Sequence, residues 1–176
     1  MASVTGRTAN WRLFGGSALL IAAILWILAI AASIGWLTAL AWLVLAAGLV
    51  IVAFGQTGGN GAVGKYTPGR VALVVFAAGW VLLAINVLLP LSGVLLAFAA
   101  IFIIVGGLVS AWAIYRKSVA KGAARWIMFI PAVLGAIWAA KLLSATLATP
   151  PWIEYLVAAA FGVTGALYLL NDRKIG

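Results

Sequence analysis

Lys141 is the residue of this 176-residue chain whose position most directly suggests chemistry. It stands in the apolar run 137–144, about ten residues before a proline-containing turn at 149–151. An ionisable group inside such a run is costly and is often functional. Glu154 lies just beyond the turn, within reach of a lysine that extends toward the membrane surface. Two interpretations stay open: a structural Lys141–Glu154 ion pair, or a site that binds a solute or an ion.

Two further polar residues could accompany Lys141 and Glu154. Asn86 lies four residues before Pro90, toward the same side of the membrane, and Ser144 shares a helical face with Lys141. Such side chains commonly hydrogen-bond a neighbouring helix, or bind backbone groups that a proline leaves free. The candidate polar site inside the membrane therefore consists of Asn86, Lys141, Ser144 and Glu154.

The residue inventory excludes most catalytic chemistry. The chain has no histidine and no cysteine, which supply the usual ligands of zinc, haem and iron–sulfur clusters and many nucleophiles and proton shuttles. Its two acidic residues, Glu154 and Asp172, are expected near opposite membrane surfaces and so cannot form a paired-carboxylate site. We therefore expect a protein that is not an enzyme and that has no cofactor and no metal.

Composition places these residues in a membrane protein. Hydrophobic residues make up 67% of the chain and charged residues only 7%, against roughly 45–50% and 25% in soluble domains. A bilayer core of about 30 Å is crossed by about 20 apolar residues, and the sequence contains six runs of about that length. The predicted fold is thus all-α, with transmembrane helices at 12–33, 36–55, 71–90, 93–115, 126–148 and 152–170.

Lysine and arginine occur before the first span, in every second loop and after the last span. Because basic loops stay in the cytoplasm, both termini are predicted to be cytoplasmic, in a multi-pass protein of the cell inner or plasma membrane. Aromatic residues near span ends are expected to form a belt at each membrane surface. These are Trp11, Tyr115, Trp126 and Tyr168 on the inner side and Trp36 and Trp152 on the outer side.

The six spans are predicted to form three tandem helical hairpins within a single domain, 1–176. Gly48, Gly107 and Gly165 are 59 and 58 residues apart, and the turns keep nearly the same period. Chance self-similarity of an alanine- and leucine-rich chain is the alternative. The expected repeats are 12–55, 71–115 and 126–170, joined by a glycine-rich cytoplasmic loop at 56–70 and a basic cytoplasmic loop at 116–125.

Small residues at four-residue spacing mark faces on which helices can approach closely in lipid. These faces either pack inside the bundle or contact a second copy or another membrane protein. The candidate packing residues are Gly106, Gly107, Ser110, Ala158, Gly162 and Ala166.

The chain carries a formal net charge of +9, almost all of it in the predicted cytoplasmic segments. Membrane topology already accounts for most of this charge, so no nucleic-acid partner is expected. Attraction to anionic lipid headgroups on the cytoplasmic side is the simpler extension. The candidate lipid contacts are Arg116, Lys117, Lys121 and Arg125.

The predicted architecture resembles the HdeD family of bacterial acid-resistance membrane proteins. The shared features are six spans in three short hairpins, basic cytoplasmic links and a glycine late in each second helix, at Gly48, Gly107 and Gly165. The resemblance covers nearly the whole chain and implies a non-enzymatic inner-membrane protein with a structural or accessory role in acid or envelope stress. The alternative function is a small-solute or ion permease, with a polar path near Lys141, Asn86 and Glu154.

Overall fold

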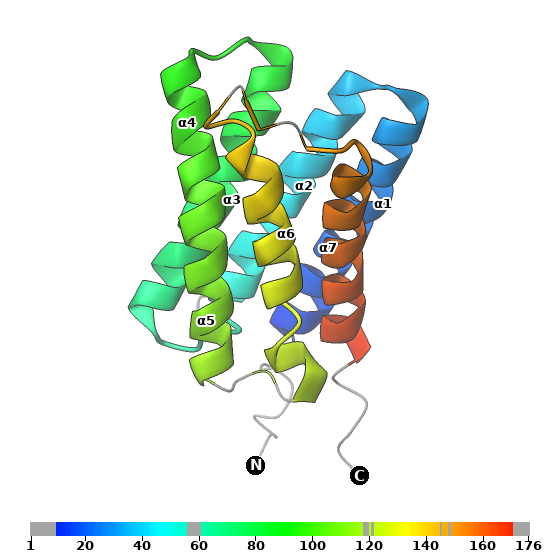
Figure 1. Ribbon diagram of the computed structural model, residues 1–176. Coiled ribbons are helices and arrows are strands. Elements are labelled where there is room, and N and C mark those ends of the chain that lie inside the picture. Colours follow the sequence, from blue (N-terminus) through cyan, green and yellow to red (C-terminus); the bar gives the residue numbers. More distant parts are fainter. Residues whose placement is uncertain are drawn as a thin grey trace, which may run out of the picture.

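The computed structural model describes residues 10–55, 61–117, 120, 122–144, 146–147 and 149–170. Over this part of the chain the regular structure is helical, and six segments are long and apolar enough to cross a membrane (Figure 1). The protein is therefore an all-helical, multi-pass membrane protein, as composition predicts. Its elements are α1 (Asn10–Ala32), α2 (Gly35–Phe54), α3 (Thr67–Leu88), α4 (Gly93–Ile101), the π-helical turn η2 (Phe102–Gly106), α5 (Gly107–Lys117), the 3-10 turn η3 (Gly122–Arg125), α6 (Phe129–Ala140) and α7 (Trp152–Leu170).

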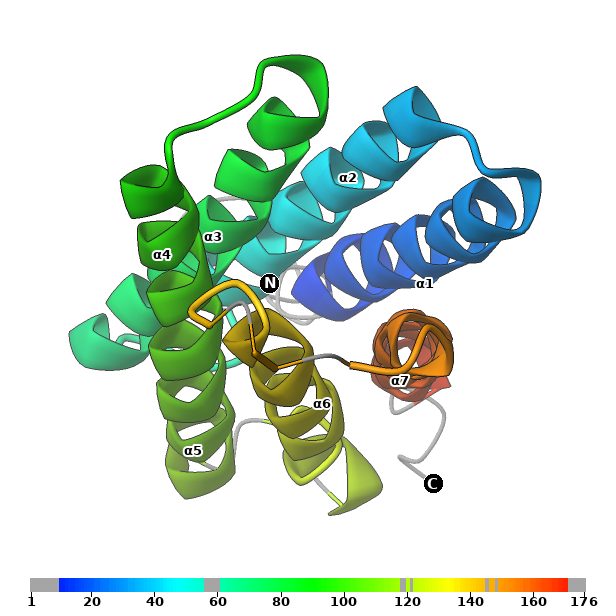
Figure 2. The ribbon, with the colours of Figure 1, turned by 45° about the horizontal axis from the view of Figure 1, so that its top comes forward.

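The spans form a closed bundle in which each one packs on its neighbours in the chain. α1 contacts α2, α2 contacts α3, and the continuous span made of α4, η2 and α5 packs on both α3 and α6. α7 packs on α6 and also on α1, so the last helix closes the ring against the first (Figure 2). The six spans therefore surround one common axis.

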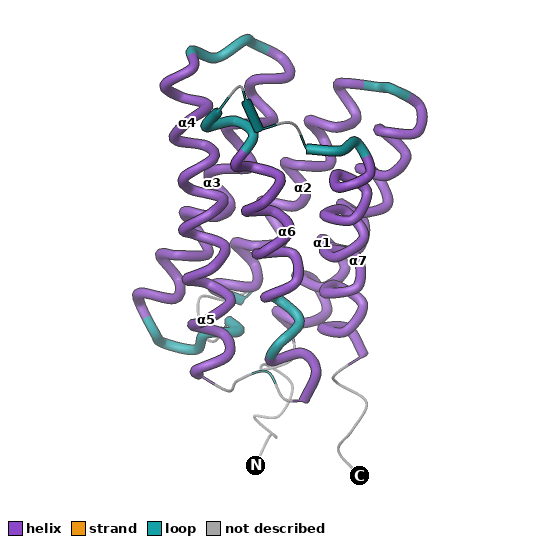
Figure 3. The backbone as a smooth tube through the Cα atoms, in the orientation of Figure 1, coloured by secondary structure: helices purple, strands orange, loops and turns teal. Residues whose placement is uncertain are grey.

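The two ends of the bundle differ in charge. α1 begins and α7 ends at the same end, where the α2–α3 and α5–α6 connections also lie (Figure 3). We call this the basic end, because it carries every lysine and arginine of the described chain except Lys141, which lies at the opposite end with Glu154. The residues that define the basic end are Arg12, Lys65, Arg70, Arg116, Lys117 and Arg125.

The span predicted at 126–148 is wrong at its second boundary. α6 ends at Ala140, and residues 141–143 form a turn that puts Lys141 at a helix end instead of inside a span. Serine and threonine side chains compete with the helical backbone for hydrogen bonds. Here Ser144 Oγ accepts the Thr146 N–H at 3.3 Å, which helps to keep this segment out of the helix.

Glycines make the closest contacts between helices. Where α7 crosses α1, a Cβ at Gly165 would lie 2.5 Å from the carbonyl oxygen of Gly16 and 2.8 Å from the nitrogen of Leu20. Where η2 crosses α3, a Cβ at Gly106 would lie 2.6 Å from the nitrogen of Phe76. Backbones can therefore touch at both crossings, and the close packing that this allows is one source of helix association in lipid.

The candidate packing residues face inward. A Cβ at Gly107 would meet the Phe76 ring of α3 at 3.2 Å, and one at Gly162 would meet Ala23 Cβ of α1 at 3.1 Å. These contacts join helices of the same chain. The rest of the set is Gly106, described above, Ser110 and Ala158, which are buried, and Ala166, which is half-buried.

The described part of the glycine-rich loop belongs to the core. The Ala62 N–H donates to the Val52 carbonyl at 2.7 Å, and both Ala62 and Val63 are buried. Gly61 touches the backbone of Ala53 so closely that no side chain would fit. This segment therefore fixes the end of α2 to the start of α3.

We expect Gly165→Ala to destabilise the folded protein, because the added Cβ meets backbone atoms of Gly16 and Leu20 that cannot rotate away. Overpacking of this kind costs about 1–3 kcal/mol. Gly93→Ala is the matched control, because a Cβ at this helical position meets nothing within 4 Å. Thermal unfolding in detergent compares the two variants, and equal melting temperatures would contradict the close α1–α7 crossing.

Candidate functional site

Four tryptophans from four helices meet on the bundle axis: Trp26 of α1, Trp42 of α2, Trp80 of α3 and Trp138 of α6. We call them the tryptophan tetrad. Every pair among them has ring centroids 5.2 to 6.1 Å apart, and one pair, Trp80–Trp138, is stacked. Aromatic pairs at such distances contribute about 0.5–1.5 kcal/mol each beyond the area they bury. The tetrad therefore joins four of the six spans directly.

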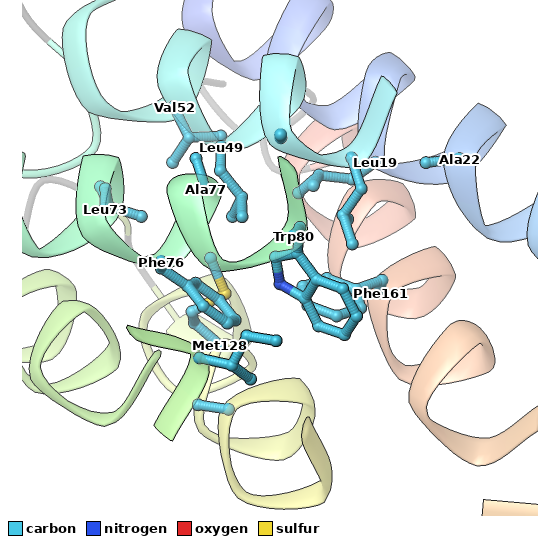
Figure 4. Packing of buried hydrophobic residues seen from close by; sticks show 14 of the residues in the cluster. Leu19, Ala22, Leu49, Val52, Leu73, Phe76, Ala77, Trp80, Met128 and Phe161 are labelled. Carbon is cyan, nitrogen blue, oxygen red and sulfur yellow. The ribbon is translucent and has the colours of Figure 1, made fainter. Parts of the chain in front are cut away.

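The aromatic core continues from the tetrad toward the basic end. Trp80 lies beside Phe161 of α7, with centroids 5.7 Å apart, and Phe161 lies 6.0 Å from Phe76 of α3 (Figure 4). All three side chains are fully buried, as is Met128 nearby. The side chains that meet on this stretch of the axis are therefore large and mostly apolar.

Glu154 connects the tetrad to the end opposite the basic end. The Trp26 Nε1–H donates to Glu154 Oε1 at 3.0 Å, which ties α1 to α7. Glu154 lies in the first turn of α7, where the helix dipole favours an anion. The indole nitrogens of Trp42, Trp80 and Trp138 are buried without a hydrogen-bond partner. Glu154 therefore satisfies one of the four indole donors of the tetrad.

Lys141 reaches the tetrad from α6. It caps the C-terminal end of that helix, where a cation is favourable, and its Nζ lies 4.5 Å from the centroid of the Trp138 ring. The described structure shows no ion pair within 4.0 Å between Lys141 and Glu154. Lys141 instead contacts the ring of Trp138, and Glu154 accepts the hydrogen bond of Trp26. The centroids of these two neighbouring indoles are 6.1 Å apart.

Asn86 and Ser144 contribute to turns at the same end of the bundle. Asn86 Oδ1 accepts the Leu91 N–H at 2.9 Å. This hydrogen bond ties the end of α3 to the backbone that follows Pro90. Ser144 Oγ lies 2.7 Å from Thr146 Oγ1. Of the candidate polar site, the structure thus brings Lys141 and Glu154 to the tetrad and uses Asn86 and Ser144 in the connections between helices.

The candidate lipid contacts that the structure describes all lie over aromatic rings. Cation–π contacts of this kind hold a long basic side chain in place while its charge remains near the membrane surface. The Arg125 Nε–H also donates to the Tyr115 carbonyl at 2.6 Å. Arg116 lies over Trp112, Lys117 over Tyr66 and Arg125 over Tyr115, at 5.0, 4.3 and 4.3 Å, while Lys121 lies outside the described residues.

Two side chains predicted at the membrane surface are buried instead. Trp11 and Tyr168 pack edge to face with centroids 5.4 Å apart, and they are only 3% and 0% exposed. They hold the start of α1 against the end of α7, next to the glycine crossing of these helices. Trp36, Trp126 and Trp152 are more than half exposed, as an aromatic belt requires.

The tetrad could not be predicted from spacing within any one span, although the sequence contains a signal for it. Of the nine tryptophans, those at 26, 42, 80 and 138 lie inside four different predicted spans and away from the ends of those spans. A tryptophan away from the membrane surface indicates a protein core more than a lipid contact. Trp112, by contrast, lies three residues before the end of its predicted span and is 45% exposed.

Neither a metal-binding group in the described part of the chain nor a similarity to a known protein indicates a function. The described residues contain no group of three or more His, Cys, Asp or Glu side chains that could hold a metal ion. No protein-family model, no curated protein and no solved structure matches this chain. The tetrad, its two charged neighbours and the basic end are therefore the features from which a function is inferred.

We expect Glu154→Leu to destabilise the bundle, because the Trp26 N–H would stay buried without an acceptor. An unsatisfied buried donor costs about 1–3 kcal/mol. Glu154→Gln is the matched control, since its amide oxygen can still accept this hydrogen bond. Unfolding of both variants in detergent, followed by tryptophan fluorescence, gives the comparison. A Leu variant as stable as the Gln variant would show that the hydrogen bond contributes nothing.

Proposed function

We propose that this protein is a non-enzymatic, HdeD-like component of the bacterial inner membrane, with a structural or accessory role in envelope or acid-stress physiology. The observation that carries the structural part is the tryptophan tetrad. Rings from four spans meet on the axis, and Phe161 of α7 extends the same core toward the basic end. A core of this kind holds the spans together as a sealed unit, and between the tetrad and the basic end Phe76 and Phe161 fill it with apolar rings.

The same proposal includes tandem hairpins. Gly48 of α2 faces Leu19 of α1, and Gly107 of α5 faces Phe76 of α3, so two successive helix pairs use the same kind of contact. Gly165 differs, because it faces α1 and not α6. We attribute the difference to ring closure: the last helix of the chain packs on the first.

Cytoplasmic termini are supported by the charge of the basic end. The first described helix begins there and the last one ends there, together with six of the seven described basic residues. The positive-inside rule assigns such an end to the cytoplasm. Lys141 and Glu154 then lie near the outer surface of the membrane.

The link to stress rests on the resemblance to the HdeD family in span number, repeat spacing and basic links. A deletion strain is expected to survive acid or envelope stress less well than its parent, with survival restored by the wild-type gene on a plasmid. Counting colonies after the stress gives the measurement. Equal survival of the two strains would remove the stress role and leave the structural one.

A sealed core predicts a specific pattern of cysteine labelling, and the natural absence of cysteine makes this test clean. Ser144→Cys should react with a membrane-impermeant thiol reagent added to intact cells, and Lys65→Cys only in inside-out vesicles. Ala132→Cys, which is fully buried between the tetrad and the basic end, should react from neither side.

The alternative, a small-solute or ion permease, is supported by the two charges next to the tetrad. A permeation path would require the rings to separate, and Ala132→Cys would then react from both faces of the membrane. That result, together with flux into proteoliposomes that changes in Lys141→Ala, would replace the sealed unit with a transporter.

A further inference from the structure

Two apolar grooves flank the first half of α3. Thr67, Val71 and Val75 lie four residues apart on one helical face and line both grooves, so they form a ridge between them. The larger groove, of about 460 Å³, lies between this ridge and residues 105–109 of η2 and α5. The smaller one, of about 400 Å³, extends to Phe54 at the end of α2.

The larger groove owes its depth to η2. Gly106 lines it and approaches α3 so closely that a Cβ would lie 2.6 Å from the nitrogen of Phe76. With no side chain at this position, the surface is hollow between the α3 ridge and the neighbouring wall. Val105 and Val109 form that wall and are 53% and 42% exposed.

Both grooves lead to cationic side chains at the basic end. Thr67, the last ridge residue, follows Tyr66, and the Lys117 Nζ lies 4.3 Å from the centroid of the Tyr66 ring. Arg70 lines the smaller groove, and its Nε–H donates to the Gly64 carbonyl at 2.9 Å, which fixes the guanidinium beside the ridge. Glu154, the acidic residue of the described chain, is at the other end.

We propose that the α3 ridge is a specific binding site for one two-chain anionic phospholipid. One acyl chain lies in each groove, on either side of Val71, and the phosphate lies near Thr67 between Lys117 and Arg70. The ridge is roughly 12 Å long at about 1.5 Å per residue, which is close to the roughly 15 Å of hydrocarbon in one leaflet. The proposal does not depend on the stress role.

The shape of the surface favours a lipid over a protein segment. A helix that docks on a membrane protein needs one continuous groove, whereas Val71 stands between two grooves and is 56% exposed. Two parallel grooves match two acyl chains. The positive charge at their common end favours an anionic headgroup over a zwitterionic one.

Native mass spectrometry of the full-length protein, with phosphatidylglycerol, its single-chain lyso form or phosphatidylcholine added to the detergent, tests the site. The wild type should retain one phosphatidylglycerol in preference to the other two lipids. Val109→Trp fills the larger groove and Val74→Trp the smaller one, and each should weaken retention about tenfold and remove the preference for two chains. Val163→Trp on α7, a residue that is 52% exposed, is the matched control and should bind as the wild type does.

The headgroup contact is tested separately with Lys117→Gln. Its preference for phosphatidylglycerol over phosphatidylcholine should fall about fivefold, which corresponds to about 1 kcal/mol per basic residue at an anionic surface. Lys141→Gln removes the same charge at the other end and should keep the preference. A cooperative thermal unfolding transition is the check that each variant is folded. If one tryptophan variant is unfolded, the other and Lys117→Gln still test the site.

Three results would overturn the proposal. The first is equal retention of phosphatidylglycerol by the wild type and by a folded variant with a filled groove. The second is equal retention of the three lipids by the wild type. The third is a copurified polypeptide, in place of lipid, that the wild type retains and Val109→Trp loses, which would assign the grooves to a protein partner.

Discussion

Helices in lipid must associate without the hydrophobic effect that drives packing in water, and the structure of this bundle depends on how its residues meet that constraint. Toward the basic end, Gly16 and Gly165 let the backbones of α1 and α7 touch. Farther along the axis, the tetrad supplies many ring contacts among α1, α2, α3 and α6. Backbone contact and ring contact thus act at different depths, and together they close the ring of six spans.

The placement of the two charges at the end opposite the basic end follows from the same aromatic core. A lone ammonium or carboxylate beside apolar side chains is unfavourable unless a partner stabilises it. Lys141 uses the face of Trp138 and Glu154 uses the N–H of Trp26, so each charge is stabilised by a different part of an indole. Glu154 therefore joins α7 to α1, whereas Lys141 contacts an indole of its own helix, and the two charges do not pair with each other.

The sequence predicts the spans well because the absence of charge over about 20 residues is a direct physical requirement for crossing the bilayer. The fifth span ends earlier than predicted, at Ala140. The apolar character of the residues that follow does not indicate that Ser144 Oγ accepts the Thr146 N–H. The site is predicted less well. Lys141 and Glu154 do lie at one end, and Lys141 contacts Trp138, three residues earlier on the same helix. The partner of Glu154 is an indole on α1, and periodicity within a span does not indicate which helix lies beside it.

The π-helical turn η2 affects the register of the span that contains it. A π-turn closes its hydrogen bonds at i+5, so it takes up one more residue than an α-turn without changing the helical faces on either side. The spacing from Gly48 to Gly107 exceeds that from Gly107 to Gly165 by one residue, and η2 lies within the longer interval, directly before Gly107. The extra residue of η2 is accommodated within this span, and α4 and α5 both still pack on α3.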